Sequence, residues 1–353
     1  MCSPPRRARL INRCEGGWRN PVRRAEKLWQ LVSGGCLSEV LAFPVAGYHS
    51  AHVAGVDPKL FAGDARVMAE VQLKVLGGYG SDFLTPPMDL TVEAEALGAR
   101  VAWGSIPPSV KEHLPLGEAG RLRDLEGAFL SSGRVPAFLE CVRILRELGG
   151  GRAVCGFAAG PLTLAASLFG ATSVLRLTRA NPRLLAELVD SAGRLVELYS
   201  SALGEAGADC VMILEPVAAL VSPQHFETLL LEPLRSAFAG VERKGGIPAL
   251  HVCGDANRIL KLMAATGARI LSIDAQVDVG RALAEVDGVV MGNVPTSLFL
   301  SSPEEVRRYT LAMLSASRGR RHIAASGCDI PVRANPESVK AMVETAKSFR
   351  VEC

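Results

Sequence analysis

The sequence predicts an α/β protein built as a single (β/α)8 TIM barrel, with an N-terminal extension and an insertion between strands 2 and 3. Eight short, mostly apolar segments alternate with helical patterns along the chain. Such apolar runs are typical of strands that are covered on both faces in a parallel sheet. The 353 residues contain no internal repeat and no composition shift that would mark a second domain. Barrels of this size commonly form one domain.

The predicted strands and helices follow one another in regular order. The strands are expected at 40–48, 81–86, 153–159, 209–215, 248–253, 269–274, 289–293 and 322–327. Three of the helices carry clear start signals, in which a capping side chain precedes a proline: Asn181-Pro182, Ser302-Pro303 and Asn335-Pro336. The insertion, residues 88–150, is expected to hold a hairpin at 100–106 and two helices.

The basic start of the chain is predicted to be a flexible arm without a role of its own. The first 27 residues carry eight Lys or Arg and two Glu, and termini of this composition are commonly frayed. Residues 1–24 are therefore assigned to the arm and residues 25–353 to the barrel.

Composition excludes several classes of protein. Apolar residues make up 48% of the chain and charged residues 21%, with a formal net charge of +3. This near-neutral balance argues against nucleic acid as the main partner. No run approaches about 18 uninterrupted apolar residues, so a membrane span is not expected. Nine scattered cysteines and the lack of a recognisable secretory signal predict a cytoplasmic protein with free thiols.

Polar side chains are expected where the barrel strands end, which is the side on which such barrels place their active sites. Glu215 ends strand 4, His251 and Cys253 end strand 5, Asp274 ends strand 6 and Cys328 follows strand 8. His251 and Cys253 are two residues apart, so both side chains point to the same face of an extended strand.

These residues predict a zinc site. We expect Asp274 and Cys328 to reach it from neighbouring strands of the same rim. One nitrogen, two sulfurs and one carboxylate oxygen form a four-coordinate set suited to Zn²⁺. Ligands spread over three strands indicate a catalytic rather than a structural metal. Asp274 is then the weak ligand that a substrate thiol displaces.

Other residues have two interpretations each. Glu215 either belongs to the site, as a catalytic group or an alternative fourth ligand, or is a carboxylate at a helix start. Tyr48, His49 and His52 follow strand 1, and either line the barrel mouth and bind the cofactor or are ordinary loop residues. Four cysteines are interpreted as small apolar packing residues: Cys36, Cys141, Cys155 and Cys210.

Five segments carry a resemblance to a known family: 79–83 (YGSDF), 88–95 (MDLTVEAE), 214–217 (LEPV), 251–254 (HVCG) and 326–331 (SGCDIP). With them, the chain resembles the uroporphyrinogen decarboxylase superfamily, and within it the cobalamin-dependent methyltransferases typified by methylcobalamin:coenzyme M methyltransferases. The resemblance implies transfer of a methyl group from a methylcorrinoid (methylcobalamin) to a zinc-bound thiol such as coenzyme M. It implies His251, Cys253 and Cys328 as firm Zn²⁺ ligands and Asp274 as the displaceable one, where the family usually has Glu.

The resemblance also implies a partner. The corrinoid of such enzymes normally rides on a separate carrier protein, and this chain has no Asp-x-His-x-x-Gly cobalamin-binding motif. We therefore expect a catalytic subunit that meets a corrinoid carrier protein and a small thiol. Homo-oligomerisation and the identity of the thiol stay open.

Three alternatives remain at this point. The first is a metal-free lyase like uroporphyrinogen decarboxylase, although residues 43–52 lack the arginines of that branch. The second is cobalamin-independent homocysteine methylation, which also uses a His-x-Cys and a distant Cys. The third is a non-catalytic barrel that binds corrinoid or thiol.

Overall fold

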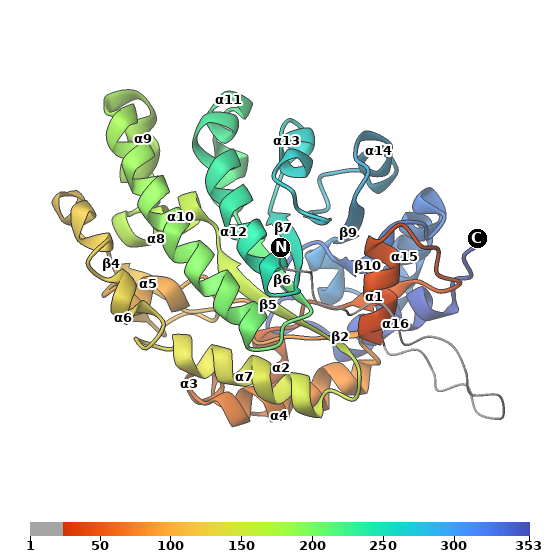
Figure 1. Cartoon of the computed structure of the whole chain (residues 1–353). Coiled ribbons are helices and arrows are strands. Elements are labelled where there is room, and N and C mark those ends of the chain that lie inside the picture. Colours follow the sequence, from red (N-terminus) through yellow and green to blue (C-terminus); the bar gives the residue numbers. More distant parts are fainter. Residues whose placement is uncertain (1–23) are drawn as a thin grey trace, which may run out of the picture.

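A computed structural model of the chain describes residues 24–353, with the side chains of Arg24, Ala119 and Arg121 left aside. Eight parallel strands form one sheet in the order β1-β10-β9-β8-β7-β6-β5-β2. The two edge strands meet, because the Asp82 amide donates to the Ala42 carbonyl at 3.0 Å. The Ala42 amide in turn donates to the Asp82 carboxylate at 2.8 Å, and Lys347 pairs with the same oxygen. The sheet is thus a (β/α)8 barrel with helices around it (Figure 1).

The strands lie where the sequence predicts them, with shorter bounds at several ends. They are β1 (Leu41–Phe43), β2 (Phe83–Leu84), β5 (Ala153–Ala159), β6 (Cys210–Leu214), β7 (Ile247–Val252), β8 (Ile270–Ile273), β9 (Val289–Val294) and β10 (His322–Ser326). The largest difference is at residues 40–48. There Pro44 cannot donate to a strand ladder, and Tyr48 already begins a helix.

One principal helix follows each strand of the barrel. These helices are α4 (Ala65–Tyr79), α7 (Val135–Leu148), α10 (Pro182–Glu205), α12 (Leu231–Arg243), α13 (Leu260–Ala265), α14 (Val279–Glu285), α15 (Pro303–Ser317) and α16 (Pro336–Ser348). The three predicted start signals are confirmed. Asn181, Ser302 and Asn335 each accept a hydrogen bond from a backbone amide in the first turn of α10, α15 and α16.

Further helices lie before β1 and in the connections. They are α1 (Arg24–Val32), α2 (Tyr48–Ala54), α3 (Pro58–Gly63), α5 (Val92–Ala96), α6 (Glu126–Phe129), α8 (Pro161–Phe169), α9 (Ala171–Ala180) and α11 (Pro223–His225). Three short 3-10 helices and one short π-helix complete the set: η1 (Leu116–Leu122), η2 (Pro216–Leu220) and η4 (Thr296–Leu300) are 3-10 helices, and η3 (Phe226–Leu230) is the π-helix.

The apolar core has two layers. Alternate strand residues such as Phe43, Phe83 and Met212 fill the barrel interior, where Leu28 and Leu31 of α1 pack against them. The remaining strand residues pack outward against the ring of helices. Helix α1 belongs to the N-terminal extension. The basic arm predicted for residues 1–24 lies outside the described residues except for the backbone of Arg24.

The insertion between β2 and β5 is confirmed, but its hairpin is longer than expected. Strand β3 (Arg100–Ala102) pairs with β4 (Ser109–Glu112) in antiparallel fashion, so the prediction of a hairpin confined to 100–106 is wrong. Pro107 and Pro108 have no amide hydrogen to donate and lie in the turn, which moves the second strand to later residues. The insertion holds three α-helices where two helices were expected, because α5 precedes the hairpin and α6 and α7 follow β4 and the η1 segment.

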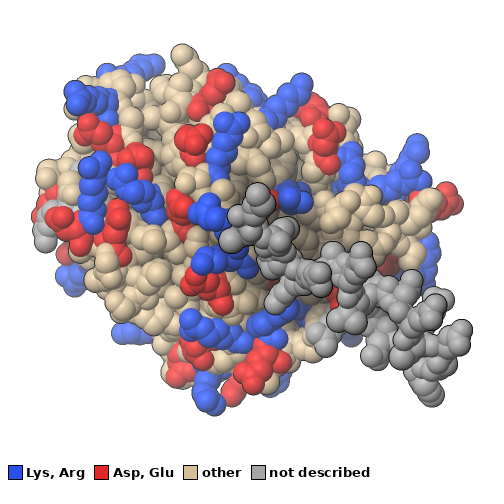
Figure 2. All heavy atoms as spheres, viewed as in Figure 1, with Lys and Arg blue, Asp and Glu red and all other residues tan. Residues whose placement is uncertain are grey.

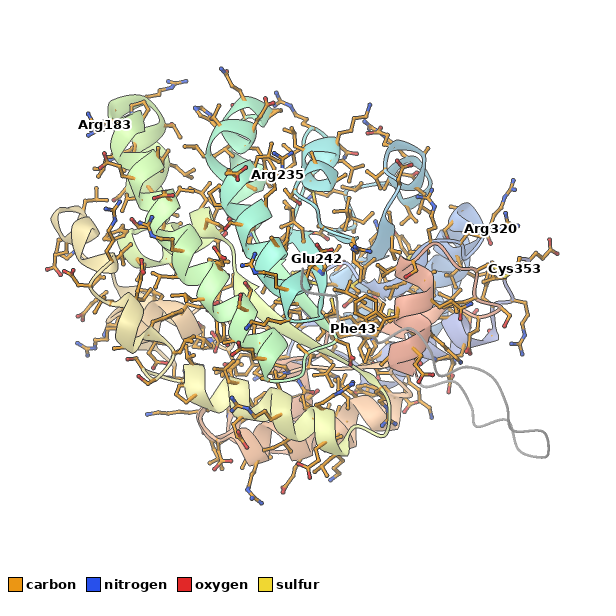
Figure 3. The ribbon with its side chains drawn as sticks, viewed as in Figure 1. Phe43, Arg183, Arg235, Glu242, Arg320 and Cys353 are labelled. Atoms are coloured by element: carbon orange, nitrogen blue, oxygen red, sulfur yellow. A yellow bond between two sulfur atoms is a disulfide. The ribbon has the colours of Figure 1, made fainter. Side chains whose placement is uncertain are left out.

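The prediction that Cys36 is a buried packing residue is wrong. Cys36 is exposed and forms a disulfide with Cys353. The C-terminal end is brought to it by a hydrogen bond from the Val351 amide to the Ser38 carbonyl. Cys353 and Arg320 lie at the same edge of the molecule (Figure 3), and the Arg320 guanidinium donates to the Glu352 carbonyl. The packing role of the other three cysteines is confirmed, since all are fully buried: Cys141, Cys155 and Cys210.

The surface in Figure 2 carries basic and acidic side chains interspersed over one face of the molecule. Within the part of the chain that the structure describes, no helix is both long enough and apolar enough to cross a membrane.

Candidate metal centre

Three ligand-type side chains converge at the C-terminal ends of the barrel strands. One ligand atom from each of His251, Cys253 and Cys328 lies within 4.8 Å of the other two. His251 is on β7, Cys253 follows β7 directly, and Cys328 follows β10. The sequence-predicted His-x-Cys pair and the distant cysteine therefore lie together, although β9 and β8 separate β10 from β7 in the sheet.

His251 presents a ring nitrogen that no protein group satisfies. Its side chain is buried, and its Nδ1 lies 3.0 Å from the Ser272 hydroxyl. Its Nε2 is buried without any hydrogen-bond partner. A buried polar atom without a partner costs about 1–3 kcal/mol, so such an atom calls for an explanation. A metal ion held by Nε2 and the two sulfurs supplies one.

The two thiols differ in acidity. The neighbouring Cys328 side chain, and then the His251 side chain beside it, lower the pKa of Cys253 to about 6. The hydrogen bond to Cys253, followed by burial, raises the pKa of Cys328. Cys253 is thus the more acidic of the two thiols, and thiolate is the form that binds metals.

Asp274 borders this cluster and is tied to the backbone. Its Oδ2 accepts hydrogen bonds from the Gly254 amide at 2.8 Å and from the Cys253 thiol at 3.3 Å. Its Oδ1 accepts from the Ala275 amide at 2.6 Å. The sequence placed Asp274 and Cys328 on neighbouring strands, which is wrong, because β9 lies between β8 and β10. Gly327 makes their approach possible, since a Cβ at this position would stand 2.9 Å from Asp274 Oδ1.

Glu215 anchors the start of a helix. Its carboxylate is fully buried and accepts hydrogen bonds from the amides of Leu162 and Thr163 in α8, and from the Thr163 hydroxyl. Burial raises the pKa of Glu215 to about 7. Among the residues that the structure describes, the metal cluster does not include Glu215. The observed contacts are those of the helix-start interpretation.

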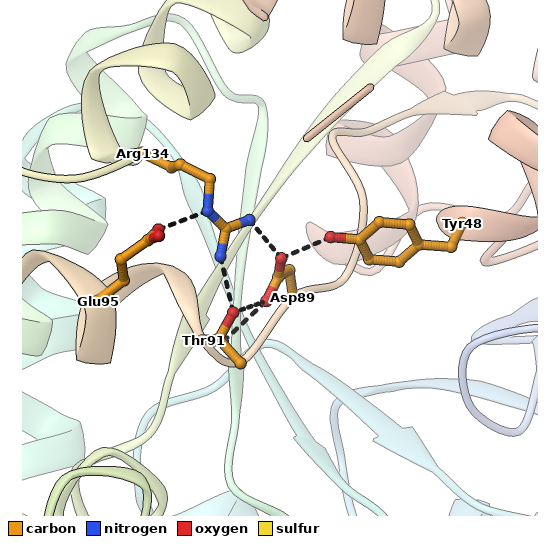
Figure 4. A network of polar contacts seen from close by, with 5 residues as sticks. All are labelled: Tyr48, Asp89, Thr91, Glu95 and Arg134. Atoms are coloured by element: carbon orange, nitrogen blue, oxygen red, sulfur yellow. Dashed lines mark hydrogen bonds and ion pairs between the residues drawn. The ribbon is translucent and has the colours of Figure 1, made fainter. Parts of the chain in front are cut away.

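Tyr48 belongs to a buried polar network rather than to an open surface (Figure 4). Its hydroxyl donates to Asp89 at 2.6 Å. The Arg134 guanidinium donates to Asp89 and Glu95 through two of its nitrogens, and to the Thr91 hydroxyl through the third. Burial, and then the Asp89 charge, raise the pKa of Tyr48. The network joins α2 to the insertion.

His49 is also buried, whereas His52 is exposed. The ring of His49 contacts the Tyr79 hydroxyl at 2.8 Å and the Val332 carbonyl at 3.2 Å, and burial lowers its pKa. His52 lines a cavity of about 960 Å³. Its other walls are Pro58, Ile106, Pro107, Leu300 and residues 329–333. Asp329 of this wall is the residue after Cys328, although none of the three ligand-type residues lines the cavity itself.

Ser272 is the residue of this site that sequence reasoning missed. A single serine in an apolar strand gives no signal on its own. The signal lies in the register, because Ser272 is the β8 partner of His251 on β7.

Comparison with known proteins identifies the family of this chain. Residues 44–349 match the family described as uroporphyrinogen decarboxylase (URO-D). The chain belongs to this family. Among its relatives, the methylcobamide:CoM methyltransferase MtaA of Methanosarcina barkeri is 30% identical over 282 residues, which cover 76% of this chain and 80% of the relative. A uroporphyrinogen decarboxylase of Paracoccus denitrificans is 30% identical over 290 residues, covering 79% and 84%.

Solved structures show the same relationship. A methyltransferase from Methanosarcina mazei superposes with a TM-score of 0.83 at 27% identity, over 93% of this chain and 99% of the other. A B12-independent methionine synthase from Shewanella superposes with a TM-score of 0.57 at 13% identity, over 89% and 95%, which is a likeness of fold. Together the family and the relatives indicate an enzyme of the methyltransferase kind.

Proposed function

We propose that the protein moves a methyl group from a methylcorrinoid to a thiol, with a zinc ion held by His251, Cys253 and Cys328. The observation that carries the proposal is the convergence of these three ligands around a buried imidazole nitrogen that lacks a partner. The similarity to methylcobamide:CoM methyltransferases supports the same reaction.

The donor set suits zinc. One imidazole and two thiolates are three of the four ligands of a tetrahedral zinc site, and catalytic zinc sites keep the fourth position for water or substrate. A zinc ion bound there would lower the pKa of a substrate thiol and so supply a thiolate at neutral pH. Whether Asp274 fills the fourth position in the resting enzyme is part of the proposal.

The residues of the chain hold and orient the reactants. Asp274 fixes the turn after β7 through Gly254 and so places Cys253. The cavity beside Asp329 offers room for a methylcorrinoid presented by a carrier protein, with His52 on its wall. In the transfer, the thiol proton passes to solvent and a sulfur–carbon bond forms. The cobalt–carbon bond breaks, and its electron pair stays on the cobalt.

Decarboxylation of a porphyrinogen is the alternative that the family name raises. It is supported less well, because residues 43–52 contain no arginine to bind the carboxylates of a tetrapyrrole. It also leaves the cluster of two cysteines and a histidine without a role.

The test combines metal analysis with a methyl-transfer assay. Purified protein is expected to hold about one zinc per chain by plasma mass spectrometry, and to convert methylcobalamin and coenzyme M into the methyl thioether. Cys253→Ala and Cys328→Ala should lose both zinc and transfer, whereas Cys141→Ala, at a buried thiol in α7, should keep both. Full transfer by metal-free Cys328→Ala protein would refute the proposal. Turnover of uroporphyrinogen in place of methylcobalamin would establish the alternative.

A further inference from the structure

His251 on β7 and Cys253 just after it each face a polar side chain at the end of β8. The strands run parallel with His251 opposite Ser272, and Val252 opposite Ile273. The next residues along, Cys253 and Asp274, are joined by a hydrogen bond of 3.3 Å. His251 and Ser272 are joined at 3.0 Å. A His-x-Cys segment is therefore matched, residue by residue, by a Ser-x-Asp segment on the neighbouring strand.

The His251–Ser272 pair points into the barrel. Side chains alternate between the two faces of a strand, and Ala249 and Ile270 belong to the apolar cluster of the barrel interior. Their neighbours Leu250 and Leu271 belong to the outer cluster. His251 and Ser272, two residues after Ala249 and Ile270, thus share the inner face. Both are buried, with 2% and 5% of their surfaces exposed.

The backbone of His251 is fixed from both sides, so the ring orientation is what remains to be set. On one side, its carbonyl accepts a hydrogen bond from the Glu215 amide at 2.9 Å. On the other side, the backbone of His251 pairs with β8. A neutral imidazole carries its proton on one nitrogen and a lone pair on the other. A hydroxyl that accepts from Nδ1–H leaves the lone pair on Nε2, the atom without a partner.

We propose that Ser272 is a positioning residue that holds the Nδ1–H tautomer and the ring plane of His251, so that Nε2 faces the two sulfurs. This inference rests on the proposed zinc site. Metal-binding histidines commonly donate their second ring nitrogen to an outer group, and loss of that group costs about 10–100-fold in metal affinity or activity. A hydroxyl adds no charge to a site that already contains two thiolates.

A second buried histidine–serine pair shows what a structural pair looks like. His322 Nδ1 lies 2.8 Å from the Ser317 hydroxyl, and its Nε2 lies 2.8 Å from the Gly292 carbonyl. Both nitrogens of His322 are therefore satisfied by protein atoms. His251 differs because its second nitrogen, Nε2, has no hydrogen-bond partner and is therefore available to a metal ion.

This pair provides a matched control. Zinc affinity is measured by chelator competition for the wild-type chain, Ser272→Ala, Ser272→Thr and Ser317→Ala, and the Co²⁺-substituted proteins are compared by their absorption bands. Ser272→Ala is expected to bind zinc about tenfold more weakly or worse, with altered Co²⁺ bands. Ser272→Thr keeps the hydroxyl and should restore most of the affinity. Ser317→Ala should bind zinc like the wild type.

The outcomes separate the inference from the proposed function. Equal zinc affinity and unchanged Co²⁺ bands in Ser272→Ala would overturn the role of Ser272 and leave the zinc site standing. A wild-type chain that binds no zinc would overturn both. Thermal unfolding of the metal-free proteins identifies a loss of folding, and the positioning role fails if Ser272→Ala lowers stability while zinc binds as before.

Discussion

Replacing Gly327 by alanine tests how tightly the rim of the barrel holds Asp274. The backbone of Gly327 does not have a positive φ, so alanine can adopt its conformation. The added Cβ would stand 2.9 Å from Asp274 Oδ1 and 3.1 Å from the Ala275 amide nitrogen. The carboxylate has little freedom to move away, because Gly254 and Ala275 hold its two oxygens.

The cost follows from those contacts. Hydrogen bonds to a charged group contribute about 1.5–3 kcal/mol each, and the displaced carboxylate regains part of this from water. Alanine also restricts the unfolded chain, which favours folding by about 0.4–1 kcal/mol. We therefore expect Gly327→Ala to lower the free energy of unfolding by about 2–4 kcal/mol. Because Asp274 raises the pKa of Cys253, its displacement should also make that thiol more acidic.

Two measurements check this expectation in metal-free protein. Urea unfolding gives the free energy, and the pH dependence of Cys253 alkylation reports its acidity. Gly78→Ala is the control, since no atom lies within 4 Å of the added Cβ and the residue is inside α4. It should stabilise the protein by roughly 0.5–1 kcal/mol. Gly327→Ala protein with wild-type stability and an unshifted alkylation profile would refute the steric argument.

Two further predictions concern buried charges. Glu215 has its pKa raised from 4.5 to about 7, so its contribution to stability is present below about pH 4.5 and lost as pH rises through about 7. Relative to the wild type, Glu215→Gln should therefore gain up to roughly 3 kcal/mol in free energy of unfolding as pH rises between those limits. A constant difference in unfolding free energy across that range would contradict this. Arg134→Met leaves Asp89 buried without its cation and should cost about 3–5 kcal/mol in urea unfolding. The exposed pair of Arg183 with Glu187 is the control, and its loss should cost less than about 1 kcal/mol; equal effects of the two replacements would disprove the burial argument.

The sequence predicted most of the barrel because its signals are local. Buried apolar runs mark the parallel strands, and the capping residues before prolines mark three helix starts. The His-x-Cys pair was predictable for the same reason, since residues two apart share a face of any strand. Cys328 could be added because strands of a barrel end at one rim.

Contacts between distant segments were beyond such reasoning. The Cys36–Cys353 disulfide joins residues 317 positions apart, and nothing in the composition near either cysteine indicates the pairing. Tyr48 follows strand 1 and was expected at the mouth, but its partners Asp89 and Arg134 lie in the insertion. Ser272 required knowledge of the register between β7 and β8.

The remaining difference between the predicted and the observed site concerns the acidic residues at the strand ends. An acid in this position of a barrel suggests catalysis, yet the carboxylates here hold backbone amides. Glu215 binds the first turn of α8, Asp329 accepts from the Gly47 amide before α2, and Asp274 accepts from Gly254 and Ala275. Backbone amides that are buried at a helix start or in a loop have no water to donate to, so they need acceptors within the protein. Holding those loops in place is how such acids serve a site whose proposed ligands are the cysteines and the histidine.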